Sequence, residues 1–244
     1  MCYRIISFGF LLICVQSINA EIPSYLKVCH KGPEFSACAV KSGNDALPHL
    51  LKGEKKMKIP NMLPMRFPEV DVDAGPTLKI KLFDLDVFGL DTVVLKNVKI
   101  DFDKLHVTLF MNAKRAALIG KYEVDGQILV LPIQGNGNLN ITIENSDFQY
   151  DFNYKLVKKN DVDYAQVLPE DTLEFQIPMA YIQLDNLFNG NKQLGDHVNK
   201  FLNENHQDAI KEMSGAIKVT ISAIGRQFFQ GIFDSIPYKD LFLD

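Results

Sequence analysis

The stretch LFNGNKQLGDHVNKFLNENH, Leu187 to His206, sets two carboxylates and two imidazoles among asparagines. Carboxyl and imidazole groups held close together can act as general acids and bases. Asparagines and aspartates also cap helices and satisfy buried backbone groups. Because Asn189-Gly190 is a turn dipeptide and Asn191 suits a helix cap, we interpret the stretch as the beginning of a helix and not as a catalytic cluster.

Nucleophilic and metal-dependent hydrolysis have little support elsewhere in the chain. There is no G-x-S-x-G elbow, and the Ser-Gly pairs at Ser42 and Ser214 lie in helical patterns. The five histidines contain no H-E-x-x-H pair, and His106 alternates outward beside Thr108. We predict no catalytic residue, no metal ligand and no enzyme activity, and we keep ester hydrolysis as an alternative.

Two short motifs imitate ligand-binding loops without meeting their spacing. Asp71 to Gly75 resembles part of a calcium loop, but its glycine is one position off the EF-hand pattern. Gly135-Asn136-Gly137 follows a strand without leading into a helix, which predicts a hairpin turn and not a phosphate cradle. We therefore predict no cofactor.

An aromatic stripe, Phe148, Tyr150, Phe152 and Tyr154, alternates with polar residues. Such a face is either ordinary core or the wall of a binding channel. In the second case, Tyr150 or Tyr154 could donate a hydrogen bond to an ester, epoxide or carbonyl of a ligand. The pattern leaves both interpretations open.

The elements that would position these side chains follow from periodicity. From Thr77 to Asp185 apolar and polar residues alternate, which predicts amphipathic strands in an antiparallel sheet. Pro60, Pro64 and Pro68 predict an extended connector before the sheet. Only Ile128 to Ile133 is apolar at both alternating positions.

Helical spacing marks two segments outside the sheet. Ala37 to Leu51 predicts a short helix ending near Gly53. From Asn191 almost to Pro237, apolar residues recur every three or four positions, which predicts one helix of about forty residues, bent or frayed at Gly215, Gly225 or Gly231. A sheet and a helix with one apolar face each bury those faces only against each other. We expect an elongated, single-domain α+β fold in which a strongly curved antiparallel sheet wraps the long helix.

The amino terminus predicts export. Residues 1–20 are typical of a signal peptide, with Arg4, an apolar run to Val15 and the small residue Ala20 at the end. Its removal would leave residues 21–244 as a single domain. The two cysteines that remain, Cys29 and Cys38, would form one disulfide. Loss of Arg4 takes the net charge from -4 to -5, which argues against a nucleic-acid partner. We expect a secreted protein without stable membrane insertion, with Asn140 as its N-glycosylation sequon.

Five blocks in order resemble the insect takeout and juvenile hormone binding protein family. They are the segment Cys29 to Pro64 with "LPHLLKG" and "IPNMLP", "FGLDTVVLKNVKIDF", "LVLPIQGNGN", the stretch from Leu187 to Glu204, and the tail "IPYKDLF". The resemblance implies a tubular lipid-binding (TULIP-like) fold with an apolar channel that carries a juvenile hormone-like terpenoid, a fatty acyl chain or another lipid. Asn191 and His206 depart from residues that relatives often have, and His206 could alter the packing of the helix.

In such a fold the apolar faces of the helices and the aromatic stripe would contact the ligand. The expected ligand-binding residues are Leu47, Leu51, Phe148, Tyr150, Phe152, Tyr154, Val198, Phe201, Leu202 and Met213. The helix that follows the disulfide would close one channel end, either as a gate or as a tied-down terminus. The alternative is an interaction protein whose channel is plugged by its own side chains. We expect a monomer, and the sequence names no receptor.

Overall fold

The computed structural model describes residues 22–73 and 75–244, so the predicted signal peptide lies outside the described residues. The helices and 3-10 turns are α1 (Phe35–Leu50), η1 (Lys55–Met57), η2 (Leu90–Thr92), η3 (Phe188–Gly190), α2 (Lys192–Glu204), α3 (His206–Glu212), α4 (Ser214–Ser235) and α5 (Tyr238–Leu241). The strands are β1 (Cys29–His30), β2 (Met65–Asp73), β3 (Leu78–Phe88), β4 (Val93–Asp101), β5 (His106–Ile128), β6 (Leu131–Lys159), β7 (Val162–Val167), β8 (Thr172–Gln176), β9 (Met179–Leu184) and β10 (Phe242–Leu243).

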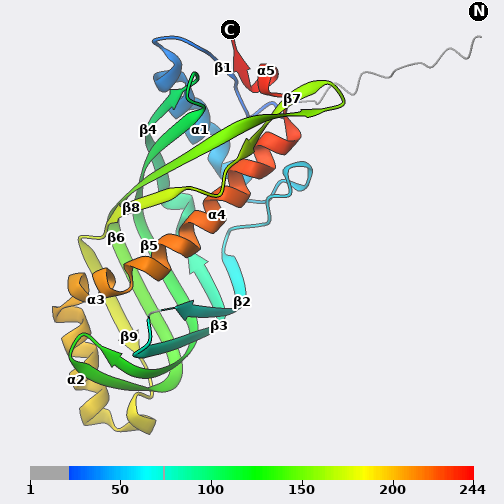
Figure 1. Cartoon of the computed structure of the whole chain (residues 1–244). Coiled ribbons are helices and arrows are strands. Elements are labelled where there is room, and N and C mark those ends of the chain that lie inside the picture. Colours follow the sequence, from blue (N-terminus) through cyan, green and yellow to red (C-terminus); the bar gives the residue numbers. More distant parts are fainter. Residues whose placement is uncertain (1–21, 74) are drawn as a thin grey trace, which may run out of the picture.

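An antiparallel sheet carries the fold, as its alternating sequence predicts. Its order is β2-β3-β5-β6-β7, with β4 on β5 and with β8 and β9 on β6. The long strands β5 and β6 change partners along their length, since β6 pairs with β9 near Ile141 and with β8 near Phe148. Figure 1 shows the sheet curling around α4, which runs along its concave side. The strongly curved α+β architecture is confirmed.

The predicted hairpin turn lies a few residues earlier than expected. Ile128 pairs with Leu131, so the turn is Leu129-Val130 and the apolar run Ile128 to Ile133 is the hairpin tip. Gly135 and Gly137 lie inside β6 instead. A Cβ at Gly137 would come within 2.3 Å of the Asp185 carbonyl oxygen, so these glycines admit a neighbouring chain segment and do not form the turn.

The single long helix predicted after Asn191 is wrong, because the chain breaks at Asn205 and Met213 into α2, α3 and α4. Asn205 leaves helical geometry, with φ -119° and ψ 30°. Its side-chain amide donates to the Phe201 carbonyl at 2.9 Å. The imidazole of His206 lies 3.1 Å from the Pro178 carbonyl, which ties the break to the segment before β9.

The three glycines named as possible bends are not where the helix breaks. Gly225 and Gly231 lie within α4 and permit close packing. A Cβ at Gly231 would lie 2.1 Å from the Met57 carbonyl oxygen, whereas one at Gly215 would meet no atom within 4 Å. The backbone of α4 therefore approaches η1 at Gly231.

The amino-terminal helix and the disulfide are confirmed. Cys29 and Cys38 are bonded, with a Cα–Cα distance of 5.9 Å, and join β1 to α1. Strand β1 pairs in parallel with β10, so the bridge also anchors the carboxyl terminus near Phe242. Among the described residues, the helices are too short or too polar to cross a lipid bilayer.

Candidate ligand-binding interior

The apolar interior consists of two tightly packed ends. The α1-end cluster joins α1, the second half of α4 and the facing ends of β4 to β8, and the α2-end cluster joins α2 to the opposite ends of β3, β5, β6 and β9. Leu50 and Phe152 are 3% and 1% exposed in the first, and Leu139 and Leu202 are each 2% exposed in the second. Both ends of the elongated interior are closed by the protein's own side chains.

Between these clusters lies a central segment that is apolar but less completely buried. On the concave face of β6, Leu139 and Tyr150 are buried, whereas Ile141, Ile143 and Phe148 between them are half-buried. Apolar groups that face inward and keep solvent access mark a place where a ligand's apolar surface can replace water. Strand β5 contributes similarly half-buried side chains, Met111 and Leu118.

Helix α4 covers this central segment loosely. Ile217, Ile221 and Ile224 in its first half are half-buried, while Ile232 and Phe233 in its second half are 8% and 4% exposed. Figure 1 shows that the first half of α4 crosses the middle of the sheet and the second half reaches the end near β7. The apolar face of one helix therefore forms dense core at one end and a half-open wall at the other.

Polar contacts hold α4 along its β7–β8 side. The Lys218 amine donates to Glu174 of β8 at 2.7 Å, and the Gln230 side chain accepts from the Val167 amide of β7 at 2.8 Å. Between them, the Arg226 guanidinium binds both carboxylate oxygens of Asp171, at 2.7 and 3.0 Å. This row of contacts fixes α4 to one edge of the central segment.

The side chains of Tyr150, Asp171 and Arg226 form one connected polar group in this region. The Asp171 side chain is 3% exposed and also accepts a 2.6 Å hydrogen bond from the Tyr150 hydroxyl. Burial by itself would raise the pKa of the Asp171 carboxyl. The hydrogen bonds from Arg226 and Tyr150 and the positive charge of Arg226 outweigh this effect, so the pKa of Asp171 is lowered. Burial and the Asp171 bond raise the pKa of Tyr150, so its hydroxyl stays a proton donor.

Most of the aromatic stripe is packed core in this structure. Tyr150, Phe152 and Tyr154 are at most 2% exposed and lie against Phe229 and Phe233 of α4. The Tyr154 hydroxyl is 3.1 Å from that of Tyr238, so both stripe hydroxyls already have protein partners. Phe148 alone is half-buried and borders the central segment.

The other predicted contact residues divide between the two ends. Leu51 belongs to the α1-end cluster, and Leu47 packs on it. Val198 and Leu202 belong to the α2-end cluster, and Met213 packs on it. Phe201 is half-buried. Phe148, which also packs on the α1-end cluster, therefore borders the central segment, and most of the others lie at the closed ends. Sequence reasoning missed Ile141, Ile143 and Ile221, although each lies in the middle of an apolar repeat.

Most asparagines of the Leu187–His206 stretch have structural partners. Asn199 accepts from the Leu184 amide at 2.9 Å and donates to the Leu184 carbonyl at 2.8 Å, and Asn203 does the same with Ile182 at 2.9 and 2.7 Å. Asn191 caps α2 by accepting from the Leu194 amide at 3.1 Å. These side chains satisfy the free edge of β9 as a further strand would, which supports the structural interpretation of this stretch.

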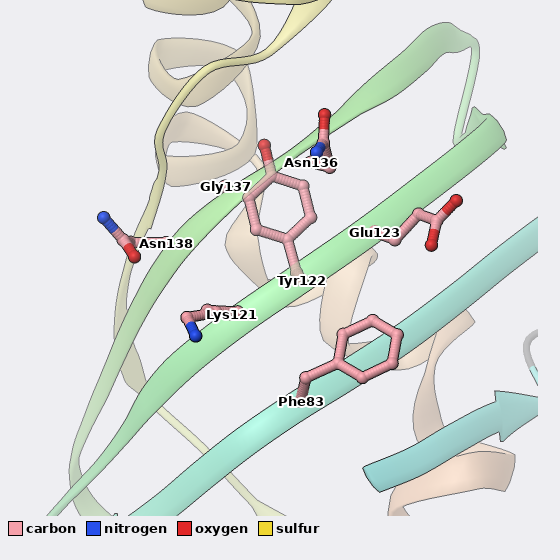
Figure 2. A pocket seen from close by; sticks show the side chains of 7 residues that line it. All are labelled: Phe83, Lys121, Tyr122, Glu123, Asn136, Gly137 and Asn138. Carbon is pink, nitrogen blue, oxygen red and sulfur yellow. The ribbon is translucent and has the colours of Figure 1, made fainter.

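A hollow of about 240 Å³ lies near the α2 end. Figure 2 shows Phe83 on β3, Lys121, Tyr122 and Glu123 on β5, and Asn136, Gly137 and Asn138 on β6 around it. The Tyr122 ring extends over the β6 strand beside Gly137, its paired residue, and its hydroxyl donates to the Asp185 carbonyl at 2.7 Å. Its lining combines charged and amide groups with the apolar surfaces of Phe83 and Tyr122.

Comparison with known proteins agrees with this architecture. Residues 9–243 match the model of the family described as haemolymph juvenile hormone binding protein (JHBP). The chain belongs to this family. JHBP membership explains the order of the five sequence blocks, which span nearly the same residues.

Individual JHBP-like relatives are distant but cover the chain. The circadian clock-controlled protein daywake of Drosophila yakuba is 28% identical over 96% of this chain and 94% of its own length. Daywake of Drosophila melanogaster is 24% identical over 94% of this chain and 91% of its own. The crystal structure of Epiphyas postvittana Takeout 1 superimposes with a TM-score of 0.77 and 27% identity, over 86% of this chain and 97% of that one.

Proposed function

We propose that this protein is a secreted, non-enzymatic carrier that holds a small hydrophobic ligand, such as a juvenile hormone-like terpenoid or a fatty acyl chain, in the central segment between sheet and α4. The observation that carries the proposal is the half-burial of inward-facing Ile141, Ile143, Phe148 and Ile221 between two closed ends. Membership of a family named for hormone binding supports the ligand class. Export rests on the signal-like residues 1–20.

Ligand capture would be driven by burial of apolar carbons. A ligand of about twenty heavy atoms, at roughly 0.3 to 0.5 kcal/mol per atom, would bind with about 6 to 10 kcal/mol, or dissociation constants from tens of micromolar to tens of nanomolar. Polar ends of the ligand would need new partners, because the hydroxyls of Tyr150 and Tyr154 are already hydrogen-bonded. We therefore expect ligands with few polar groups to be preferred.

The second candidate is an interaction protein with a plugged interior. The observation that favours it is the close packing of Phe152 with Phe229 and Phe233, whose ring centroids lie 5.2 and 6.2 Å away. That packing fills the α1 end but does not reach the central segment. The two candidates therefore differ in whether the centre accepts a ligand.

Displacement of a fluorescent fatty-acid probe by a terpenoid and lipid panel separates these functions. The variant Ile221→Trp would fill the central segment, and we expect at least tenfold weaker probe binding. Val219→Trp is the matched control, because Val219 lies on the same helix and is 72% exposed. Probe binding that is absent, or equal in both variants, would contradict the carrier. Turnover of a bound ester, abolished by changing one serine or histidine, would show a hydrolase instead.

A further inference from the structure

The outer face of the sheet carries an apolar belt that the ligand-binding proposal does not explain. Phe88, Ile119, Met179 and Tyr181 are 41%, 44%, 58% and 56% exposed. They lie on the face opposite α4, since the residues beside them, Val87, Leu118 and Ile182, pack into the α2-end cluster. We call Phe88, Ala117, Ile119, Met179 and Tyr181 the outer belt.

Strand register places the two apolar sides of the belt on either side of β6. Phe88 of β3 pairs with Ala117 of β5, Ala117 pairs with Thr142 of β6, and Thr142 pairs with Tyr181 of β9. These residues therefore form one row across four adjacent strands. Directly opposed side chains on one sheet face are close enough to touch.

The glycosylation sequon lies inside this belt. Asn140 is exposed on β6 and pairs with Ile119 on one side and with Gln183 on the other. Thr142, the hydroxyl residue of the sequon, occupies the row between Ala117 and Tyr181, and its Oγ1 lies 3.5 Å from Asn140 Oδ1. A group attached to Asn140 would emerge between the two apolar sides of the belt.

We propose that Asn140 carries an N-linked glycan whose first sugars cover the outer belt. In the attachment step, Nδ2 of Asn140 bonds to C1 of an N-acetylglucosamine, and the bond from C1 to the phosphate oxygen of a lipid-linked oligosaccharyl diphosphate breaks. Nδ2 loses one proton, the lipid diphosphate departs, and nothing is oxidised. The proposal rests on export, which the proposed function also assumes, but it does not depend on ligand binding.

The surface around Asn140 suits a sugar better than a protein partner. A sugar ring has an apolar C–H face that can pack on Ile119 and Tyr181, and hydroxyls that need polar partners. The hollow shown in Figure 2 begins at Asn138, which is on the same face of β6 and about 6.8 Å along the strand from Asn140. It offers the Asn138 amide as a partner, together with the Lys121 amine, which also donates to Asp84 at 3.0 Å, and the Phe83 ring lies beside them. Apolar and polar surfaces thus lie on either side of the attachment point.

Attachment of a glycan to Asn140 is tested by intact-mass and glycopeptide mass spectrometry of protein secreted by a eukaryotic cell. We expect a glycan on wild-type protein and on Thr142→Ser, which keeps the sequon, and none on Asn140→Gln or Thr142→Ala. An unmodified Asn140 in secreted wild-type protein would overturn the proposal. Failure of export, seen as absence from the medium, would instead contradict the proposed function.

Covering of the belt is tested on protein that has already folded. After enzymatic removal of the glycan, we expect at least twofold more bis-ANS fluorescence and a shift toward dimers or larger species by light scattering. Thr142→Ala should behave like deglycosylated protein, and adding Ile119→Thr and Tyr181→Thr should restore the wild-type behaviour. Unchanged dye binding and mass after deglycosylation would show that the glycan leaves the belt open. Dimerisation of the glycosylated protein through the belt would show a second copy as its occupant.

Discussion

Asn199 of α2 and Leu184 of β9 exchange two hydrogen bonds, from the Leu184 amide to the side-chain oxygen at 2.9 Å and from the side-chain amide to the Leu184 carbonyl at 2.8 Å. Asn203 repeats the arrangement with Ile182. On α1, Asn44 does the same with Leu95 of β4, at 2.8 and 2.9 Å. Helix-borne asparagines thus stand in for missing neighbour strands at two sheet edges.

Replacing Asn199 or Asn203 with alanine should lower the free energy of unfolding by roughly 1 to 3 kcal/mol each, because a strand amide and a carbonyl would lose their partners. Urea unfolding followed by circular dichroism measures the effect. Asn205→Ala is the control, since Asn205 bonds only within its own helix break, to Phe201. Equal losses in all three variants would mean that edge pairing is not the cause.

The Asp171–Arg226 pair predicts a pH-dependent stability. Because the folded-state pKa of Asp171 is lowered, its contribution is present above the unfolded pKa of about 4 and is lost as pH falls through the folded value. Arg226→Met should cost roughly 2 to 4 kcal/mol at pH 7, less than for a fully buried pair because the Arg226 side chain is 38% exposed. Without Arg226, burial should raise the pKa of Asp171, so the cost should shrink as pH falls from 7 toward 4.

Denaturant unfolding of wild type and Arg226→Met at several pH values checks this sign. The double variant Asp171→Asn with Arg226→Met removes the titrating group. The difference in free energy of unfolding between this variant and Arg226→Met should also shrink as pH falls from 7 toward 4. A cost of Arg226→Met that grows on acidification would contradict the assignment.

Two glycines of α4 predict opposite effects of the same substitution. Gly231→Ala should destabilise the fold by about 1 to 3 kcal/mol or more, because its Cβ would meet the backbone carbonyl of Met57 at 2.1 Å. Gly215→Ala, with no atom within 4 Å of its Cβ, should stabilise the fold by roughly 0.5 to 1 kcal/mol through helix propensity. Thermal unfolding of both proteins distinguishes them, and a stabilising Gly231→Ala would refute the close contact with η1.

The disulfide variant Cys29→Ser with Cys38→Ser tests whether α1 is a gate. Behind α1, the rings of Phe35, Phe102 and Phe242 pack together with centroids 5.2 to 6.0 Å apart. We therefore expect a structural role: a loss of about 2 to 3 kcal/mol, lowering the melting temperature by roughly 5 to 10 °C, with an unchanged probe release rate. Faster release from protein that is still folded by circular dichroism would establish the gate.

Much of the fold was predictable from local pattern. Alternation along β3 to β9 assigns an inward and an outward face, since successive strand side chains point to opposite sides. The cap at Asn191 and the Cys29–Cys38 bridge depend on short-range sequence or on a single possible pairing, and the structure confirms both.

Other features depended on residues far apart in the chain. The break at Asn205 was missed because His206 reaches the Pro178 carbonyl, a contact invisible to helical periodicity. The glycines of β6 were taken for a turn because the approach of the segment at Asp185 is a tertiary event. Likewise, no sequence motif indicated Asp171, because its partner Arg226 lies far along the chain on α4.

The candidate site shows the same division. The sequence by itself determined that Phe148, Tyr150, Phe152 and Tyr154 share one apolar face, because the period of a strand is two. Only the tertiary structure decided that Phe229 and Phe233 cover most of that face and leave Phe148 at its margin. Periodicity reports which side of an element is apolar, whereas the degree of filling depends on how closely two distant elements approach.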